Sequence, residues 1–307
     1  MAYFGKEIKK LGFGFMRLPM LEDGEHTDLE QTKQMVDRFM AAGCTYFDTA
    51  YVYGKDGESE KAMRASLVER YPRDSFTIAT KLNAWLACNS EEEAKQQIYT
   101  SLERLGTDYV DFYLLHAIQD NNWKVYEDWH LWEYMEELKE KGLVKHWGFS
   151  FHATPELLEE TLTKHPGAEF VQLQINYVDW IDPRVQAEQC YEVCRKHNKP
   201  VIVMEPVKGG TLAKLPDEAV ELFKDMDPSM SPANWAIRFA ASQPGVMVVL
   251  SGMSSFEQMQ DNISCMEDFK PLTEKEQEAC FKAAEIINNQ ITVPCTACHY
   301  CTEGCPM

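Results

Sequence analysis

Residues 90–116 read SEEEAKQQIYTSLERLGTDYVDFYLLH, and this stretch joins one helix to one buried strand. Ser90 before three glutamates is typical of a helix N-terminus, because its side-chain oxygen caps backbone N–H groups and acidic residues suit the helix dipole. Gly106 is a plausible left-handed residue after the helix. The apolar run Tyr109–Leu115 predicts a strand. We therefore expect a helix over Glu91–Leu105, a turn and a strand, which is the repeating unit of a parallel sheet.

The same kind of unit recurs along the chain. Helical patterns cover Gln31–Ala42 and Asp128–Lys141, and one more helix is expected over Thr273–Asn289. Eight units in about 250 residues predict an α/β fold, the (β/α)8 TIM barrel. The alternative is a doubly wound open sheet, although no Gly-x-Gly-x-x-Gly turn follows an early strand, as a dinucleotide-binding Rossmann domain would require. The expected strands are Leu11–Phe15, Thr45–Asp48, Phe76–Lys81, Tyr109–Leu115, His146–Ser150, Phe170–Asn176, Pro200–Glu205 and Val246–Ser251.

Composition narrows the class of protein. The 307 residues carry a formal net charge of −19, which argues against a nucleic-acid partner or an anionic membrane surface. No apolar run approaches the roughly 18 residues that span a bilayer, and the first ten residues lack the apolar segment of a signal peptide. We expect a cytoplasmic protein with a barrel over residues 1–290 and a short cysteine-rich C-terminal tail over 291–307.

Polar side chains follow the first strands of the expected barrel. Asp48, Lys81 and His116 each stand at or just after an apolar run, and Tyr53 comes five residues after Asp48. Singly, these residues could be a helix cap, a solvated lysine, a satisfied histidine and a rim aromatic. Together they would meet at the carboxyl ends of the strands, where barrel enzymes place their active sites.

The chemistry of these four residues suits proton donation. A lysine ammonium should lower the pKa of a nearby tyrosine, and a carboxylate should keep that lysine charged. A histidine can orient a substrate carbonyl while the tyrosine protonates its oxygen. Because none of the four is an obvious nucleophile, we expect a hydride from a cofactor to attack the carbonyl carbon.

The sequence over roughly residues 8–290 resembles the aldo-keto reductase family. The resemblance implies that Asp48, Tyr53, Lys81 and His116 form a catalytic tetrad with Tyr53 as general acid. It implies NAD(P)H-dependent reduction of an aldehyde or ketone to an alcohol. The matching motifs are Gly12-Phe13-Gly14, Arg17-Leu18-Pro19, Gly43-Cys44-Thr45-Tyr46-Phe47-Asp48-Thr49-Ala50, Leu102-Glu103-Arg104-Leu105-Gly106, Asp108-Tyr109-Val110-Asp111 and Leu114-Leu115-His116.

The resemblance also implies where an extended nicotinamide cofactor lies. Phe151 replaces the family's carboxamide-binding asparagine, and Met204 stands where many members place an aromatic residue. The cofactor is expected to be NADPH or NADH. Because no lysine or arginine lies between Arg238 and Lys270, we expect no strong preference for NADPH, with NADH used at least comparably. The implied cofactor contacts are Ser150, Gln172, Asn176, Glu205, Pro206, Lys208, Gly210, Ser251, Gly252, Ser255, Gln258 and Asn262.

The last cysteines form a metal-binding pattern. Cys295, Cys298, Cys301 and Cys305 give C-x2-C-x2-C-x3-C-P, the bacterial ferredoxin run for iron–sulfur ligation, with zinc as the alternative. In two-cluster ferredoxins the fourth cysteine binds the other cluster, so either the segment is incomplete or one cluster takes all four. A bacterial subgroup of the family resembles this arrangement. We expect a [4Fe-4S] cluster in a longer chain, a redox partner for it, and little or no cluster here.

Other outcomes stay open at this point. The chain could be a nicotinamide-binding regulatory protein without turnover, or an iron–sulfur electron-transfer protein. The expected substrate is a small carbonyl compound whose identity the sequence does not give. The six earlier cysteines, including Cys190 and Cys194, are expected to pack in the core. Five aromatic residues are candidates either for the pocket wall or for loop packing: Tyr51, Trp85, Trp123, Trp129 and Trp180.

Overall fold

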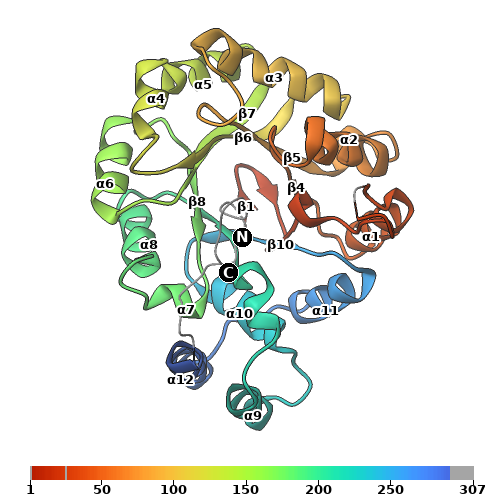
Figure 1. Cartoon of the computed structure of the whole chain (residues 1–307), viewed down its shortest axis with the longest axis vertical. Helices are drawn as coiled ribbons and strands as arrows, with labels where there is room; N and C mark the ends of the chain where they lie inside the picture. Colours follow the sequence, from red (N-terminus) through yellow and green to blue (C-terminus); the bar gives the residue numbers. More distant parts are fainter. Residues whose placement is uncertain (1, 25, 291–307) are drawn as a thin grey trace.

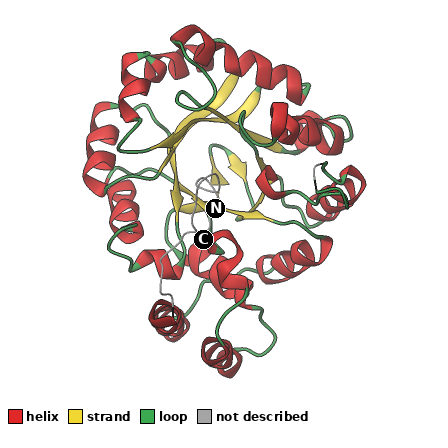
Figure 2. Cartoon of the chain, in the orientation of Figure 1, coloured by secondary structure: helices red, strands yellow, loops and turns green. Residues whose placement is uncertain are grey.

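In the computed structural model, which describes residues 2–24 and 26–290, eight parallel strands close into a barrel. Helices surround the strands on all sides (Figures 1 and 2). Both the predicted TIM barrel and all eight predicted strands are confirmed. In barrel order the strands are β10 (Val246–Gly252), β3 (Leu11–Gly14), β4 (Tyr46–Asp48), β5 (Thr77–Leu82), β6 (Val110–Ile118), β7 (Val144–Phe151), β8 (Phe170–Gln174) and β9 (Val201–Met204).

The helices lie outside the barrel, where helices such as α5, α8 and α10 pack against the strands, whereas α12 packs against α7, α9 and α10. The α-helices are α1 (Leu29–Ala41), α2 (Glu58–Met63), α3 (Glu91–Leu105), α4 (Trp123–Asp128), α5 (Leu131–Glu140), α6 (Pro155–Lys164), α7 (Tyr177–Trp180), α8 (Ala187–Lys196), α9 (Asp217–Met226), α10 (Pro232–Ser242), α11 (Phe256–Met266) and α12 (Glu274–Gln290). The shorter helical turns are η1 (Phe15–Arg17), η2 (Lys55–Gly57), η3 (Arg64–Val68), η4 (Arg73–Ser75) and η5 (Lys208–Ala213).

Local sequence signals explain several helix boundaries, because the N-cap side chains of α1, α3, α6, α10 and α11 accept backbone hydrogen bonds. The Ser90 hydroxyl accepts a hydrogen bond from the Glu93 N–H, and Gly106 ends α3 with φ +68°, as predicted. The predicted helix over residues 128–141 is wrong at its start. His130 adopts a left-handed φ of +49°, which divides the segment into α4 and α5. This break carries no glycine or proline signal.

Two apolar layers hold the fold together. One lies inside the barrel and includes Tyr46, Phe112, Phe170 and Ile202, and the larger one lies between the strands and the outer helices. A hairpin of β1 (Ala2–Tyr3) and β2 (Lys6–Glu7) carries Phe4, whose ring centroid lies 5.8 Å from that of Phe112. The start of the chain therefore packs on the inner layer.

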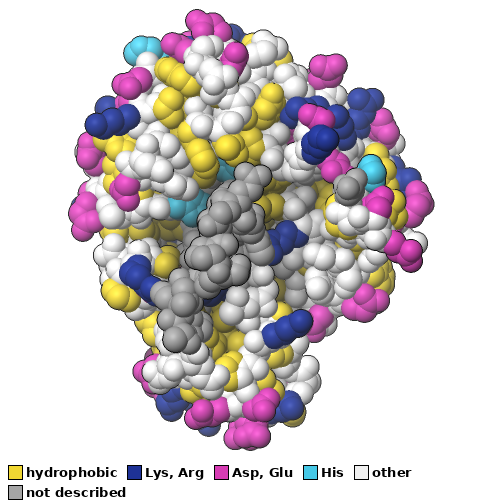
Figure 3. Space-filling model, in the orientation of Figure 1, with side chains coloured by type: hydrophobic (Ala, Val, Ile, Leu, Met, Phe, Trp, Pro, Cys, Tyr) yellow, Lys and Arg dark blue, Asp and Glu magenta, His cyan; other side chains and the backbone are white. Residues whose placement is uncertain are grey.

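Acidic side chains lie on the surface, and four of the six described cysteines are buried as the sequence predicts. Acidic side chains gather around the outer rim of the face in Figure 3. Among the described cysteines, Cys44, Cys190, Cys194 and Cys280 are buried, whereas Cys88 and Cys265 are only partly buried. Cys295, Cys298, Cys301 and Cys305 lie outside the described residues. Across residues 2–24 and 26–290, no helix has the length and apolar character that a membrane crossing needs.

Candidate active site

The four predicted catalytic side chains lie together at the carboxyl ends of neighbouring strands. Asp48 ends β4, Lys81 lies in β5 and His116 lies in β6, and these three strands pair in parallel. The Lys81 ammonium donates to Asp48 Oδ1 at 2.5 Å and to the Thr49 carbonyl at 2.7 Å. It lies 4.9 Å from the ring centroid of Tyr53. The rings of Tyr53 and His116 pack edge to face, with their centroids 5.6 Å apart.

The loop after β4 holds Tyr53 through its backbone. The Tyr53 N–H donates to the Ala50 carbonyl at 3.1 Å, and the Tyr53 carbonyl accepts from the Ser59 N–H at 3.3 Å. The Ser59 hydroxyl shares a 2.7 Å hydrogen bond with Thr49 and donates to the Phe15 carbonyl at 2.9 Å. Gly54, with φ +72°, provides the left-handed turn that follows the tyrosine. The backbone of Tyr53 is therefore held by hydrogen bonds on both sides.

The backbone around His116 is held in an unusual conformation. Ala117 has φ +54°, which is costly for a residue other than glycine. Its N–H donates to Ser150 Oγ at 2.7 Å, and its carbonyl accepts from the Asn122 amide at 2.9 Å. The Tyr126 hydroxyl donates to the His116 carbonyl at 2.5 Å. These three side chains stabilise the turn that aims the imidazole, and Ser150 keeps a hydroxyl hydrogen to donate elsewhere.

Burial shifts the pKa values of the group. Burial, the Lys81 charge and His152 lower the pKa of His116 well below its usual range, so its imidazole is neutral. Burial raises the pKa of Asp48, while Lys81 and Gln172 lower it. Burial, Asp48 and Glu205 raise the pKa of Tyr53, contrary to the expected lowering by lysine. The desolvation of the phenolate outweighs the nearby ammonium, so the phenol stays protonated.

The side of the mouth formed by β8 and β9 contains a buried polar network around Asp179. Gln174 donates to its carboxylate at 2.7 Å, Asn176 donates at 2.5 Å, and Lys208 forms an ion pair with it. The Asn176 oxygen also accepts from the N–H groups of Val178 and Asp179. Asn176 and Lys208, both predicted cofactor contacts, are thus engaged with Asp179.

The segment after β10 forms a helix N-terminus at the mouth. Ser255 caps α11 by accepting from the Gln258 N–H at 3.3 Å, and the Gln258 side chain accepts from the Ser254 N–H at 2.8 Å. The Asn262 amide donates to Ser251 Oγ at 2.9 Å. Four predicted cofactor contacts, Ser251, Ser255, Gln258 and Asn262, therefore lie at or next to the start of α11, whose N-terminal amides suit a phosphate.

The model of the Aldo/keto reductase family matches residues 10–285, which is most of the chain. The chain belongs to the aldo/keto reductase family. It is an oxidoreductase of the aldo-keto reductase type.

Individual relatives are distant but cover nearly the whole chain. The chain is 26% identical over 304 residues to the uncharacterized oxidoreductase YqkF of Bacillus subtilis, covering 89% of this chain and 92% of that protein. The holo form of aldo-keto reductase AKR11C1 from Bacillus halodurans superposes with a TM-score of 0.72 at 25% identity, covering 91% and 93% of the two chains. An aldo-keto reductase from Klebsiella pneumoniae in complex with NADPH superposes with a TM-score of 0.70 at 21% identity, covering 90% of each chain.

In this aldo-keto reductase, the fold places Arg17 beside the predicted cofactor contacts, although the sequence did not identify it as one of them. Arg17, in η1, packs its side-chain carbons against Gly252, and its carbonyl accepts from the Ser254 hydroxyl at 2.9 Å. Its guanidinium donates to the Gly209 carbonyl at 3.2 Å. The arginine therefore joins the loop after β9 to the loop after β10. Its place in the motif Arg17-Leu18-Pro19 was the only sequence signal.

The aromatic candidates for the pocket wall separate into two groups. Trp85 is 38% exposed, next to the exposed Leu86, in the loop after β5. Trp180 is buried and packs against Tyr191 and Phe239, and the Tyr51 ring stacks on Arg104. Trp123 and Trp129 pack on the core. Trp85 is therefore the most exposed of the five, Trp180 is buried, and Tyr51, Trp123 and Trp129 are partly buried.

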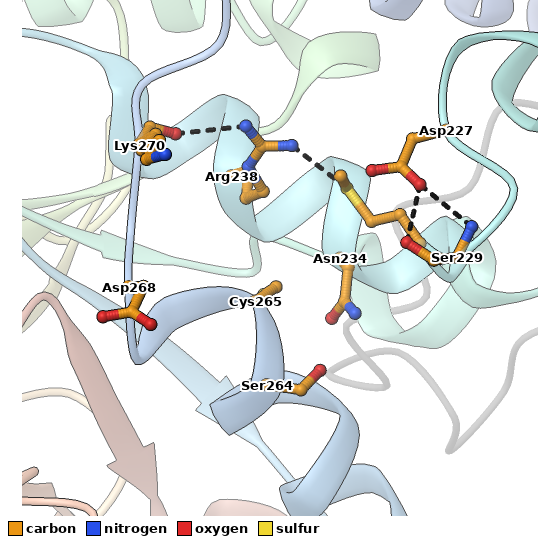
Figure 4. A pocket seen from close by; sticks show the side chains of 9 residues that line it. Asp227, Ser229, Asn234, Arg238, Ser264, Cys265, Asp268 and Lys270 are labelled. Carbon is orange, nitrogen blue, oxygen red and sulfur yellow. Dashed lines mark hydrogen bonds between the residues drawn. The ribbon is translucent and has the colours of Figure 1, made fainter.

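A hollow lies between α10 and α11, on the outer ring of the aldo-keto reductase barrel (Figure 4). Its volume is about 290 Å³. Arg238 donates to the Met230 sulfur and to the Lys270 carbonyl, and Ser229 bonds to Asp227. Asn234, which also lines the hollow, has a buried Oδ1 without a hydrogen-bond partner, and none of these residues belongs to the tetrad. The barrel mouth therefore remains the candidate active site.

Proposed function

We propose that the protein is an NADPH-dependent reductase of aldehydes or ketones, with Tyr53 as the general acid. The observation that carries this proposal is the contact of Lys81 with Asp48 beside the Tyr53 ring, with the neutral His116 facing the same ring. Four groups of suitable chemistry on consecutive strand ends are hard to explain as structural residues. Membership of the family supports the same conclusion.

The residues of the chain divide the proton chemistry between them. Neutral His116 donates a hydrogen bond to the carbonyl oxygen of the substrate and orients it. Tyr53 transfers its phenolic proton to that oxygen, which becomes the hydroxyl of the alcohol. The phenolate that is left behind lies near the Lys81 ammonium, and Asp48 holds that ammonium in place. Tyr53 then regains a proton from solvent.

The mouth has polar groups that suit a nicotinamide dinucleotide. Asp48 Oδ2, His116 Nδ1 and Glu205 Oε2 are buried without a hydrogen-bond partner. Ser150 and Gln172, on neighbouring strands, would hold the carboxamide, and the N-terminus of α11 with Ser255 would hold a phosphate. When bound, the reduced nicotinamide supplies the hydride to the carbonyl carbon.

The choice of NADPH revises the expectation drawn from the sequence. That expectation rested on the lack of lysine and arginine in residues 239–269 alone. The fold brings Arg17 against Gly252 and Ser254, and Arg38 of α1 donates to the Gln260 side chain at 3.3 Å. Arg17 and Arg38, both near the start of the chain, thus place two positive charges beside residues 239–269. The NADPH complex of the Klebsiella pneumoniae structure supports the same choice.

A substrate screen tests this proposal. The purified chain is mixed with a panel of aliphatic, aromatic and keto-acid carbonyl compounds, and oxidation of NADPH or NADH is followed by absorbance. We expect turnover of at least one aldehyde with NADPH, and a kcat/KM with NADPH at least equal to that with NADH. Tight nucleotide binding without turnover of any compound would instead favour the regulatory alternative.

The iron–sulfur function is a separate proposal that rests on cysteine spacing. We propose that Cys295, Cys298, Cys301 and Cys305 belong to a ferredoxin-type segment that serves a redox partner. Among the described residues, no group of three or more His, Cys, Asp or Glu side chains could hold a metal. Iron and sulfide analysis decides between this proposal and the expectation of little cluster: a stoichiometric brown chromophore would support iron–sulfur ligation and contradict that expectation.

A further inference from the structure

The hollow between α10 and α11 is a cavity outside the barrel mouth. Its volume of about 290 Å³ is close to the lower end of the range for small-molecule pockets. Its walls are α10, α11, the segment before α10 and the segment after α11 (Figure 4). None of its lining residues, all in the described part of the chain, is a member of the tetrad or a predicted cofactor contact. The hollow can therefore hold a ligand while the mouth holds nucleotide and substrate.

The Asn234 side chain presents a hydrogen-bond acceptor to the hollow. It points from α10 toward α11, with its oxygen on the side of Cys265 and Ser264 (Figure 4), and the residue is only 2% exposed. Its Nδ2 donates to Asp261 Oδ1 at 3.1 Å, and because an ionised carboxylate can only accept, this bond fixes which amide atom is the nitrogen. Among the described residues, the buried Oδ1 has no hydrogen-bond partner, which is costly for a polar atom. A ligand with an N–H or O–H donor would satisfy it.

Arg238 supplies hydrogen-bond donors on another wall of the hollow. Its guanidinium donates to the Met230 sulfur at 3.2 Å and to the Lys270 carbonyl at 3.2 Å. A third contact, with Glu276 Oε1, is longer at 3.7 Å. Because a thioether is a weak acceptor and a guanidinium has five N–H groups, a ligand carboxylate would be a stronger partner than the Met230 sulfur. The arginine can therefore bind an anionic group without losing a strong bond.

The formal charges around the hollow cancel. Asp227 and Asp268 contribute two negative charges, and Arg238 and Lys270 contribute two positive charges. A ligand with a net charge would meet repulsion as well as attraction, whereas a dipolar ligand can place each of its charges near the opposite one. The lining therefore favours a molecule that carries both signs of charge.

We propose that the hollow binds a small zwitterion of the free α-amino acid class, whose ammonium donates to Asn234 Oδ1 and whose carboxylate accepts from Arg238. This site goes beyond the proposed reductase function and does not depend on it. We expect a Kd on the order of 1 mM, which is within the reach of so small a ligand.

An NMR titration of the 15N-labelled full chain, with NADPH present to occupy the mouth, tests the proposal. The probe is L-alanine, and the ligand controls are propionate and ethylamine, which each keep only one of its two charged groups. We expect saturable shifts of the backbone amides of Asn234, Arg238 and Cys265 with L-alanine, and about tenfold or more weaker binding of each control. Shifts confined to the mouth, no saturable shift, or equal binding of a control would overturn the proposal.

Variants test the assigned contact. Asn234→Ala removes the acceptor and should raise the Kd for L-alanine about tenfold or more. Asn289→Ala, the same change at an exposed position near the end of α12, is the matched control and should keep the wild-type Kd. If urea unfolding shows that Asn234→Ala does not fold, Cys265→Leu replaces it, since the larger side chain should fill the hollow and abolish binding. An unchanged Kd in the folded variant would overturn the proposal. These measurements do not depend on carbonyl turnover, so they fail separately from the proposed function.

Discussion

The Lys81 ammonium contacts the Asp48 carboxylate at 2.5 Å, with side-chain exposures of only 1% and 6%. The same ammonium donates to the Thr49 carbonyl, so two of its three hydrogens are held by the end of β4. The remaining side of the lysine lies near the Tyr53 ring. The pair therefore fixes a positive charge beside the phenol and accounts for two of the four polar residues at the mouth.

Breaking this buried pair should destabilise the fold. Lys81→Met leaves the Asp48 carboxylate buried without its partner, so the free energy of unfolding should fall by about 3–5 kcal/mol. Urea unfolding at pH 7 measures the change. The double variant Asp48→Asn/Lys81→Met removes both charges and should be more stable than Lys81→Met alone. Additive losses in the double variant would show that the two side chains are not coupled.

Arg17 should contribute to dinucleotide binding. Arg17→Met removes a cation that borders both the loop after β9 and the loop after β10, so the Kd for NADPH should rise about tenfold or more, as expected for loss of a charge-assisted hydrogen bond. Fluorescence titration measures the Kd. Arg195→Met is the control, because Arg195 lies beside Gly245 at the opposite end of β10. An unchanged Kd would remove Arg17 from the cofactor site.

The pKa of His152 gives a pH dependence of stability. Burial lowers this pKa to about 4, below the value of about 6.5 in an unfolded chain. As the pH falls below 6.5, the unfolded chain therefore binds a proton that the folded chain does not, and stability decreases. Between pH 7 and pH 5 the loss from this residue should be about 1–2 kcal/mol.

Unfolding of His152→Asn measures this contribution. The variant should lose less stability than the wild type over the same pH range. His130→Asn, at an exposed position that already has a left-handed backbone, is the matched control. The account is contradicted if both variants follow the wild-type pH dependence.

The sequence predicts the parts of the structure that depend on local signals. Ser90 and Gly106 mark the ends of α3 because capping needs only neighbouring residues. The four-residue site is predictable because parallel strands bring their carboxyl ends together. The break at His130 is not predictable in this way, since no glycine or proline marks it.

Long-range contacts account for what the sequence did not predict. The Arg17 carbonyl and the Ser254 hydroxyl are 237 positions apart, so a search of residues near Ser254 cannot find the arginine. The Asp179 network also has no local signal, because Lys208 comes from a different loop. The direction of the Tyr53 pKa depends on burial, which spacing alone does not give.

The measurement that tests the central claim most directly compares Tyr53→Phe with Tyr51→Phe in aldehyde reduction and NADPH binding. Each variant loses one hydroxyl from the same loop, but the Tyr51 ring stacks on Arg104 and is assigned no part in proton transfer. We expect kcat to fall by about 100- to 10,000-fold in Tyr53→Phe, as for loss of a general acid. The Kd for NADPH should change little, and Tyr51→Phe should keep nearly wild-type kcat. A Tyr53→Phe enzyme with wild-type kcat would contradict the account.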